Sequence, residues 1–334
     1  MAPYGVTQNN HSTLEVHDAP APFNKSTADV ILRSSDLCDF RVRRAILAEA
    51  SSVFEGMFAL PQPPHTNSSG YGPSAGGDEH RDGLPVLAMQ EDSRTLDSLL
   101  RICYPVVSPS FDSLEALSPV LAAAVKYAVD GAIATMRVEL RRLAKLHPLR
   151  VYCLSMHYGF LEEAEEAAKA SLAFPTQQLF ARAAHFPELE LVNGKIPIYL
   201  INYHQACVND LRVLTHCLPF LDDDDWVWFT CEEDEDVCPT SDSLISLGSG
   251  ALVRTARWWS SYMSSVQEIL WSQPCGSAIR DATWRFDTAL NRAQGCPQCG
   301  SFAREQMNAF IEDLIAFVDK RVSAVRQMHT SHSG

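Results

Sequence analysis

Residues 28–58 read ADVILRSSDLCDFRVRRAILAEASSVFEGMF, and this stretch decides the fold of the first part of the chain. It opens with a short apolar run that is typical of a buried strand, and Ser35-Asp36 then supplies turn chemistry. Residues 38–42 alternate between apolar and charged side chains, which is the period of a strand with one buried face. From Ala45 onward the apolar residues recur at helical spacing. The stretch therefore predicts a β-hairpin followed by one amphipathic helix.

The residues after this helix predict a third strand and a second helix. Residues 84–90, LPVLAMQ, form a short apolar run of the kind found in strands. The polar triplet Glu91-Asp92-Ser93 follows as a helix start, and apolar side chains recur at helical spacing up to Tyr104. Pro105 ends this helix, because proline disfavours the helical conformation of the residue before it.

Two more helices are predicted before residue 147. Asp112 and Glu115 are spaced as in a capping box, in which two side chains satisfy free N–H groups at a helix start. Ser118-Pro119 predicts the start of another helix, with serine as the N-cap and proline at the first helical position. The apolar patterns of residues 119–130 and 131–146 complete a helical pair.

The order of these elements resembles the BTB/POZ domain, a module that binds proteins and is not a catalyst. Residues 93–104 are similar to the helix that reads LLRYIYTG in this family, and residues 119–146 resemble its VLEAAKKYDM…LR pair. Tyr104-Pro105 stands in place of the usual Tyr-Thr-Gly, a variant similar to that of BTB proteins expanded in mushroom-forming fungi. The resemblance covers residues 23–146 and implies that this part of the chain acts by assembly.

The resemblance also implies a dimer surface with a charged pocket at its base. The helix over residues 45–58 and the N-terminal segment would contribute most of this surface. Asp29 and Arg44 match the charged-pocket positions of the family, and a structural ion pair between strand and helix explains these two charges equally well. Arg43 stands where the family has a histidine. The apolar side chains that the surface would present are Phe54, Met57 and Phe58.

Two functions of different classes are compatible with this resemblance. The first is a substrate adaptor that docks on a cullin-type ubiquitin ligase, and Met89-Gln90-Glu91 fits the loose hydrophobic-x-acid pattern associated with scaffold binding. The second is a transcriptional or scaffolding regulator without a ubiquitin role. Both predict protein partners, through a homodimer or a hetero-oligomer of the BTB/POZ domain. A redox protein that uses Cys296 and Cys299 is a remote third class.

The composition favours an interaction protein over several other classes. The net charge of −14 opposes binding to phosphate backbones, so we expect no nucleic acid partner. No basic region followed by an apolar core opens the chain, so we expect no signal peptide. No apolar run approaches the roughly 20 residues that span a bilayer, so we expect no membrane partner. Ten cysteines without a secretory signal favour a reducing cytoplasmic or nuclear setting.

The predicted fold class is α+β, with a BTB/POZ fold of short sheet and helical bundle followed by a mostly helical C-terminal region. Residues 61–83 are rich in Pro, Gly and Ser, and they predict an exposed insertion in the first domain. The predicted segments are a disordered tail (1–21), the BTB/POZ domain (22–147), a helical extension (148–180), the C-terminal domain (181–328) and a second tail (329–334).

Several elements are predicted in the second half of the chain. Residues 148–174 predict two helices, in which His157 is expected as a packed core or interface histidine and not as a ligand. Residues 196–217 predict one helix with a single buried face that includes Ile198, Leu200 and Ile201, and residues 304–325 predict a long terminal helix. The apolar run Trp226-Val227-Trp228-Phe229 predicts a strand. The aromatic side chains expected to form a buried helix face are Trp258, Trp259, Tyr262, Trp271 and Trp284.

A zinc site is predicted from the cysteines of the C-terminal region. The sequence GCPQCG at residues 295–300 is similar to a zinc knuckle, in which two thiolates on a tight turn bind one metal. Gly300 would allow the positive φ of such a turn. Tetrahedral zinc needs four ligands, and the best second pair has a six-residue gap that is wider than usual. The predicted ligands of a structural zinc ion are Cys231, Cys238, Cys296 and Cys299.

These cysteines are also compatible with roles that involve no zinc. A Cys-Pro-x-Cys sequence that opens a helix is also the thioredoxin-type redox motif, but no βαβ unit is predicted around it. All four could be ordinary packed thiols, which behave as small apolar side chains. A catalytic zinc and an enzyme are not expected, because no HExxH, phosphate-loop, dinucleotide or serine-hydrolase motif occurs. The alternative partners of Cys231 are Cys207, Cys217, His204 and His216.

Overall fold

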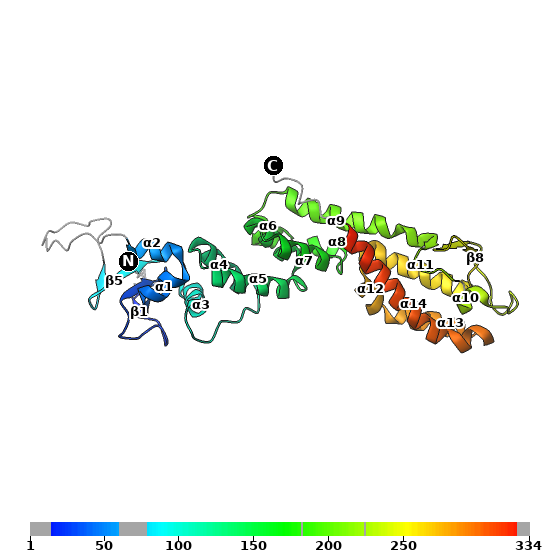
Figure 1. Ribbon diagram of the computed structural model, residues 1–334, viewed down its shortest axis with the longest axis horizontal. Coiled ribbons are helices and arrows are strands. Elements are labelled where there is room, and N and C mark those ends of the chain that lie inside the picture. The colour runs from blue at the N-terminus through cyan, green and yellow to red at the C-terminus, as the bar shows by residue number, and fades with distance from the viewer. Residues whose placement is uncertain (1–14, 60–78, 182, 224, 326–334) are drawn as a thin grey trace, which may run out of the picture. The chain divides into compact units, whose positions relative to one another are not determined.

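The computed structural model describes residues 15–59, 79–181, 183–223 and 225–325. The chain divides into two compact units, Met1–Glu139 and Leu140–Gly334 (Figure 1). The first unit combines a sheet with helices and the second is mostly helical, so the predicted α+β class is confirmed. The predicted tail 329–334 lies outside the described residues, as do most of the tail 1–21 and of the insertion 61–83.

A five-stranded sheet lies in the first unit. Its strands are β1 (His17–Asp18), β2 (Val30–Arg33), β3 (Cys38–Val42), β4 (His80–Arg81) and β5 (Leu84–Ala88). They follow the order β1-β3-β2-β5-β4. β2 and β3 form the predicted hairpin, with Leu32 opposite Phe40 in an antiparallel register, and β5 pairs with β2 in parallel. β4 pairs with β5 at the sheet edge. β4 lies within the segment 61–83 that was predicted as an exposed insertion.

Polar side chains fix the turn of the hairpin. The N–H of Cys38 donates to Ser34 Oγ at 2.9 Å, and the Ser34 hydroxyl donates to Asp36. The Asp36 carboxylate also accepts the N–H and the hydroxyl of Ser93, at 2.8 and 2.6 Å. The predicted turn at Ser35-Asp36 is confirmed, and the same aspartate ties the turn to the start of a later helix.

Two short helices follow the hairpin where the sequence predicted one. α1 (Arg44–Ala50) and α2 (Ser52–Ala59) are separated by Ser51, whose φ of −153° and ψ of 120° are extended. The Ser51 hydroxyl accepts the N–H of Phe54 at 3.0 Å and donates to the carbonyl of Tyr127. The single-helix prediction is wrong because a serine side chain can bond to nearby backbone groups and so begin a new helix.

Three longer helices follow, α3 (Ser93–Cys103), α4 (Leu114–Lys126) and α5 (Asp130–Ala144). Asp92 caps α3 by accepting the N–H of Thr95 at 2.8 Å. The predicted helix start at Ser118-Pro119 is wrong, because Pro119 lies inside α4. The lack of a proline N–H removes one intrahelical hydrogen bond there, a cost that the buried face of α4 offsets.

The helices α6 (Pro148–Tyr158) and α7 (Leu161–Ser171), near the start of the second unit, confirm the predicted helix pair. They pack against each other and turn at Gly159, whose φ of 73° glycine adopts without steric cost. His157 is exposed, and its Nδ1 atom lies 3.0 Å from the carbonyl oxygen of Leu191. The prediction of a core position for His157 is therefore wrong, and the alternative of an interface position stays a prediction.

α9 (Lys195–Leu211) is shorter than the helix predicted over residues 196–217. It ends at a 3-10 helix, η3 (Arg212–Thr215), where the backbone turns toward a small sheet. Ile198 and Ile201, which were expected on its buried face, are exposed. The shorter helices that precede α9 are α8 (Thr176–Phe180), η1 (Ala183–His185) and η2 (Pro187–Leu189).

A small sheet and a single helical turn precede the last helices. The sheet has the order β6-β7-β8, formed by β6 (Cys217–Leu218), β7 (Ile245–Leu247) and β8 (Leu252–Val253). α10 (Val227–Thr230) lies where a strand was predicted. That prediction is wrong because an apolar run of four residues does not distinguish a strand from a buried helical turn.

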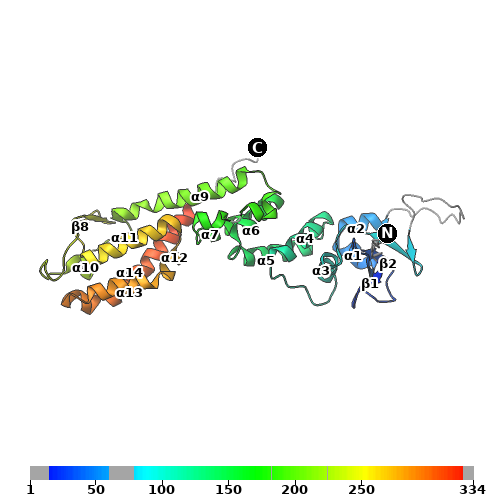
Figure 2. The same ribbon diagram turned by 180° about the vertical axis from the view of Figure 1, so that it is seen from behind.

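The last helices of the chain pack together as a bundle. They are α11 (Arg257–Ser272), α12 (Gly276–Asp281), α13 (Thr283–Ala293) and α14 (Pro297–Ala324). α11 packs on α13, both α12 and α13 pack on α14, and α9 lies along α11 and α14 (Figures 1 and 2). The predicted terminal helix is confirmed, but it begins at Pro297 and not at Arg304. No helix within the described ranges is both long enough and apolar enough to cross a bilayer.

An aromatic cluster fills the core of this bundle. Trp228 of α10 stacks on Trp259 of α11, with ring centroids 5.7 Å apart and an interplanar angle of 8°. Phe310 of α14 meets both indoles edge-on, with its ring centroid 5.5 Å from each. Edge-to-face contacts of this kind add to the stabilisation from apolar burial, so the cluster joins three helices.

The predicted aromatic face of α11 is confirmed in part. Trp258, Trp259 and Tyr262 are buried as expected. Trp271 and Trp284 are 54% and 63% exposed, so the prediction is wrong for both. Trp271 is the next-to-last residue of α11, and Trp284 belongs to a separate helix, α13.

Candidate metal centre and interaction surface

Four cysteines from two distant segments come together in the second unit. Cys231 follows α10 and Cys238 lies in the loop after it, while Cys296 precedes α14 and Cys299 lies in its first turn. The Sγ atoms of Cys231 and Cys296 are 3.5 Å apart, and those of Cys238 and Cys299 are 3.7 Å apart. All four Sγ atoms lie within 4.8 Å of one another. The structure therefore brings together the four residues that were predicted as ligands.

The distances between the sulfurs fit a tetrahedral thiolate site. Zinc–sulfur bonds of about 2.3 Å place the sulfurs of a regular tetrahedron about 3.8 Å apart. The two close pairs, at 3.5 and 3.7 Å, are near this separation. Four soft sulfur donors in this arrangement suit zinc better than calcium or magnesium, which prefer oxygen. The cluster could therefore hold one zinc ion.

The start of α14 positions two of the sulfurs. Cys296 has extended backbone angles as the N-cap, and Pro297 occupies the first turn of the helix, where its missing N–H is not needed. The N–H of Cys299 points to Cys296 Sγ at 3.3 Å. This is a helix N-terminus and not the tight turn of a zinc knuckle, so the expected positive φ at Gly300 is wrong. A side chain at Gly300 would approach the backbone of Gln294 to 3.3 Å, which favours glycine there.

The acidic loop between Cys231 and Cys238 is shaped by hydrogen bonds. The N–H of Cys238 donates to the carbonyl of Asp234 at 2.8 Å, which closes a turn before the second cysteine. The N–H of Glu232 donates to the side chain of Gln298 at 2.9 Å, which ties the loop to the first turn of α14. These bonds explain how a six-residue gap, wider than that of common zinc motifs, still presents both sulfurs to one point.

Burial disfavours the thiolate form of two of these cysteines. It raises the pKa of Cys238 to about 12 and also moves the pKa of Cys299 upward. Burial acts in the same direction on Cys296, but hydrogen bonds from the Cys299 N–H and from the neighbouring thiols outweigh it and lower the pKa of Cys296. A bound cation would reverse this balance, because metal coordination deprotonates a thiol.

Trp258 of α11 lies beside this cluster. Its Nε1 atom is buried and has no conventional hydrogen-bond partner in the described part of the chain. The indole N–H counteracts the effect of burial by lowering the pKa of Cys299. A donor directed at a thiolate is typical of the outer shell of metal sites, where it tunes and orients the ligands.

The alternative partners proposed for Cys231 lie elsewhere in the second unit. Among the described residues, the grouping of sulfurs within ligand distance contains none of Cys207, Cys217, His204 or His216. His204 is buried on α9, with its Nε2 atom 3.3 Å from the carbonyl oxygen of Phe174. Burial lowers the pKa of His204 and so favours its neutral form. This histidine is therefore part of the core.

The apolar residues predicted for an interaction surface differ in their exposure. Phe54 is only 1% exposed and stacks on Tyr127, with ring centroids 5.0 Å apart. The expectation that Phe54 adds to the exposed surface is wrong, because it lies on the inner face of α2. Met57 and Phe58 are half-buried, and Val53 beside them is exposed.

Asp29 and Arg44 are joined by a hydrogen bond from the backbone. Asp29 Oδ1 accepts the N–H of Arg44 at 2.8 Å, so the carboxylate satisfies a free N–H at the start of α1. The Arg44 guanidinium lies over the ring of Phe58, with its central carbon 5.7 Å from the ring centroid. The structure therefore places Asp29 in a helix-capping position.

Met89 and Glu91, the residues of the predicted scaffold-binding triplet, are engaged within the first unit. Met89 is buried. The Glu91 carboxylate accepts hydrogen bonds from Lys126 Nζ at 2.8 Å and from the Tyr127 hydroxyl at 2.7 Å. Burial acts to raise the pKa of Glu91, but these hydrogen bonds outweigh it and lower the pKa.

The comparison with protein families identifies the N-terminal segment. Residues 21–142 match the model of the BTB/POZ domain. This segment is a BTB/POZ domain. BTB/POZ domains are non-catalytic modules that mediate oligomerisation and protein binding, so the predicted interaction role of this part of the chain is confirmed at that level. A search of curated proteins finds no match to the chain.

The BTB/POZ domain also contains a charge cluster that the sequence did not predict. Asp39 of β3 is fully buried, and its carboxylate accepts hydrogen bonds from the guanidinium groups of Arg33 at 2.6 Å and Arg81 at 2.5 Å. Burial acts to raise the pKa of Asp39, but the two arginines outweigh it and lower the pKa. The alternation of β3 assigned Asp39 to an outer face, and Arg81 lies in the predicted insertion. No local pattern in the sequence could have paired Asp39 with Arg81, which is 42 positions away.

Proposed function

We propose that this chain is an assembly protein, in which the BTB/POZ domain binds protein partners and a second unit stabilised by zinc carries a further surface. The observation that supports this most is the family match over residues 21–142. The outer face of α2 offers apolar area for self-association, because Val53 is 41% exposed and Met57 and Phe58 are half-buried. A homodimer through this face is the simplest assembly.

Zinc has a structural role in this proposal. Cys231, Cys238, Cys296 and Cys299 would hold the ion, which when bound supplies positive charge to buried thiolates. Four protein ligands complete a tetrahedral site and leave no open position for substrate, as in other structural zinc sites. The ligands join segments that are 65 residues apart in sequence, so the metal affinity would contribute to the folding free energy of the second unit.

The partners of the assembly separate two finer hypotheses. A cullin-type ubiquitin ligase adaptor needs a docking surface, and the support for it in the sequence was Met89 and Glu91. Both side chains are engaged within the BTB/POZ domain, which favours a scaffolding or regulatory protein without a ubiquitin role. The placement among BTB proteins of mushroom-forming fungi stays a hypothesis that rests on Tyr104-Pro105.

Light scattering of the full chain tests the assembly. We expect a dimer at micromolar concentration, and we expect Val53→Asp to shift it toward monomer because the carboxylate would be desolvated in the interface. Val107→Asp is the matched control, because Val107 is an 83% exposed valine outside α2. A wild-type chain that stays monomeric would contradict self-association.

Affinity purification with mass spectrometry then tests the finer hypotheses. Recovery of cullin peptides with the wild-type chain would support the adaptor, whereas reproducible partners without any cullin would support the scaffolding role. Glu91→Ala provides the check on the triplet, because a cullin that is bound through it should be lost with this variant.

A further inference from the structure

A furrow of linked hollows runs along α11 and α13 in the second unit. Its first hollow, of about 300 Å³, borders Cys238 and Cys296 at the cysteine cluster. It shares Trp258, Ser261 and Arg292 with a second hollow of about 190 Å³. The two hollows are therefore adjacent, and the first borders two of the four cysteines.

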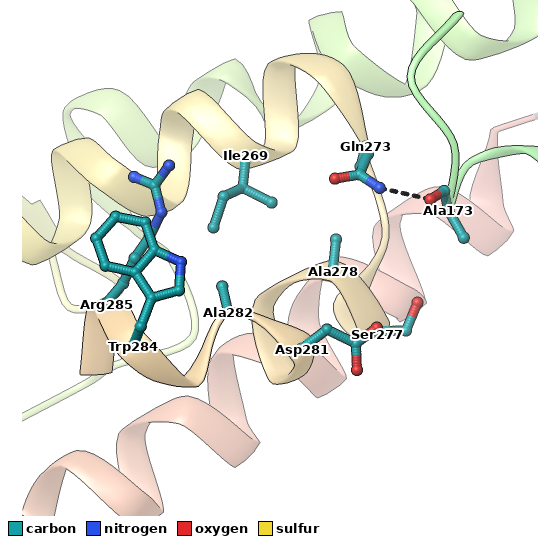
Figure 3. A pocket seen from close by; sticks show the side chains of 9 residues that line it. All are labelled: Ala173, Ile269, Gln273, Ser277, Ala278, Asp281, Ala282, Trp284 and Arg285. Carbon is teal, nitrogen blue, oxygen red and sulfur yellow. Dashed lines mark hydrogen bonds between the residues drawn. The ribbon is translucent and has the colours of Figure 1, made fainter. Parts of the chain in front are cut away.

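A third hollow, of about 290 Å³, extends the furrow toward α12. It shares Trp284 and Arg285 with the second hollow. Figure 3 shows Trp284 and Arg285 together at one side of this hollow, and Gln273 hydrogen-bonded to Ala173 at the other. We call the whole furrow the arginine groove, and the residues that define it are Arg257, Trp258, Ser261, Trp284, Arg285 and Arg292.

The length of the arginine groove suits a short extended peptide. It follows α11 from Arg257 to Gln273, which at about 1.5 Å per residue corresponds to roughly 24 Å. An extended chain rises about 3.3 Å per residue, so about seven residues would fill this length.

The charge of the groove is opposite to that of the protein. Three arginines line the first two hollows and no acidic residue does, although the chain as a whole carries a net charge of −14. Asp281 is the acid that lines the third hollow. The carboxylate of Glu235, in the nearby acidic loop, accepts two hydrogen bonds from Thr240. The N–H of Thr240 donates to it at 2.9 Å, and the hydroxyl of Thr240 donates to its other oxygen. Arginines are therefore the charged residues that line the first two hollows, although Glu268 pairs with Arg285 and the charge of Glu235 acts on Arg257.

The arginines of the groove differ in how far they are already engaged. Arg257 donates to the carbonyl of Thr240 at 3.2 Å, and Arg285 donates to the carbonyl of Ser265 at 2.9 Å and to Glu268 at 3.2 Å. Arg292 is exposed, and although its backbone carbonyl accepts the N–H of Gly295, its guanidinium has no hydrogen-bond or ion-pair partner among the described residues. Its guanidinium, with donors suited to a carboxylate, is therefore free to bind one.

The exposed indole of Trp284 adds an apolar contact. Trp284 is 63% exposed, and the Arg285 guanidinium lies 4.8 Å from the centroid of its ring. This cation–π contact orients both side chains, so less side-chain entropy is lost when a ligand binds. An exposed tryptophan beside arginines is the composition found at the centre of protein-binding surfaces.

We propose that the arginine groove binds a short, extended acidic segment of a partner protein, with carboxylates on Arg292 and Arg257 and an apolar side chain on Trp284. Charge complementarity selects this occupant, because the arginines are matched by carboxylates and not by basic or neutral peptides. A long nucleic acid is disfavoured, since the net charge of −14 repels a polyanion beyond the groove. The proposal goes beyond assembly through the BTB/POZ domain and does not depend on it.

Selection from a library of random short peptides, with the full chain as bait, tests this proposal. We expect enrichment of peptides that combine several Asp or Glu residues with an aromatic or aliphatic residue. A selected peptide, labelled for fluorescence anisotropy, should bind the Arg292→Glu variant about tenfold more weakly, since like charges would then face each other. Binding should also weaken with salt, because the groove is exposed. Trp284→Ala should weaken it as well, and the fold should tolerate this change because the indole is exposed.

Arg280→Glu is the matched control for charge. Arg280 is an exposed arginine of α12, paired with Glu312 and not part of the groove lining, so its variant should bind the peptide as the wild type does. Circular dichroism and a melting curve confirm that each variant is folded. Enrichment of basic or neutral peptides, or equal loss with Arg292→Glu and Arg280→Glu, would overturn the proposal. A monomeric chain that still binds the acidic peptide would contradict self-association through the BTB/POZ domain and leave this proposal intact.

Discussion

The two units stabilise their buried polar groups in different ways. In the BTB/POZ domain the buried carboxylate of Asp39 is paired with Arg33 and Arg81, so its counter-charges come from the chain itself. In the second unit four clustered cysteines lie beside an aromatic core, and burial disfavours the thiolate form of two of them. The first cluster is therefore sensitive to pH and to substitution, whereas we expect the second to be sensitive to metal.

The two units also differ in the sequence separation of the residues that their polar contacts join. Some polar contacts of the BTB/POZ hairpin join residues that are close in sequence, such as Ser34 and Cys38, while others reach later elements, such as Asp36 with Ser93. The cysteine cluster joins residues 61 and 65 positions apart. A unit held by such distant contacts depends on each of them, because no neighbouring element can replace the connection.

Removal of zinc should have the largest effect, and only on the second unit. At a free zinc concentration about 1,000-fold above Kd, binding contributes about 4 kcal/mol to the free energy of unfolding. For a unit of this size that corresponds to roughly 8–16 °C in melting temperature. Native mass spectrometry should report one zinc per chain, and scanning calorimetry with a chelator should lower one transition while the BTB/POZ transition stays in place.

Cys296→Ser should reproduce the effect of the chelator, and Cys217→Ser serves as its control. Cys217 is a half-buried free thiol of β6 that lies outside the cluster. Zinc content of one per chain in the Cys296→Ser variant, or an absence of zinc from the wild type, would contradict a four-cysteine site.

The N-terminal fold could be predicted well because its signals are local. The strand over residues 38–42 and the turn at Ser35-Asp36 each have signals within a few positions, and the structure confirms both elements, although the buried Asp39 breaks the predicted alternation. The break at Ser51 was missed, because its hydroxyl donates to the carbonyl of Tyr127, which is 76 positions away. Asp39 was assigned to an outer face for the same reason, since Arg81 is 42 positions away.

The C-terminal region was predictable in its ligands but not in their setting. The pair Cys296 and Cys299 has a recognised spacing, and the tetrahedral requirement for two more ligands led to Cys231 and Cys238. The local conformation was predicted as a turn, but it is the start of α14, because the apolar pattern of that helix becomes regular only further along the chain. No sequence pattern predicted the arginine groove, since its defining residues belong to two separate helices, α11 and α13.

Asp39→Asn should have the next largest effect, confined to the BTB/POZ domain. It leaves Arg33 and Arg81 without their buried counter-charge, and we expect the free energy of unfolding to fall by about 3 kcal/mol. Asp97→Asn is the control, because Asp97 forms a more exposed pair with Arg101 at i,i+4, worth about 0.3–0.5 kcal/mol. Urea titration of both variants measures the difference, and equal losses would contradict a special role for the buried pair.

The contribution of Asp39 should also depend on pH. Its pKa is lowered in the folded state, so its stabilisation is present above the unfolded pKa of about 3.9 and is lost as the pH falls through the folded value. The gap between the wild type and Asp39→Asn should therefore be constant near neutrality and should close in acid. A gap that widens in acid would show that the charge state of Asp39 does not cause it.

Ser51→Ala should have a smaller effect that tests why one predicted helix is two. The variant removes the side-chain cap on the N–H of Phe54 and the bond to the carbonyl of Tyr127, and loss of a cap costs about 1 kcal/mol. Ser52→Ala, at an exposed neighbouring serine, should change the free energy of unfolding far less. If the two variants unfold at the same urea concentration, the hydroxyl of Ser51 does not determine the break.

The smallest effect should come from shortening the predicted insertion, provided that β4 is kept. Replacing residues 62–77 by a short Gly-Ser linker should change the free energy of unfolding by about 1 kcal/mol or less, because loop-closure entropy varies by only about 0.6 kcal/mol per doubling of length. Extending the deletion to residue 82 removes β4 and the contact of Arg81 with Asp39, so this longer deletion should destabilise the BTB/POZ domain by several times as much. Thermal melting of both variants measures the contrast. Equal melting temperatures would mean that the Arg81 contact contributes little, and the distinction between local and distant contacts in the BTB/POZ domain would then rest on Ser51 alone.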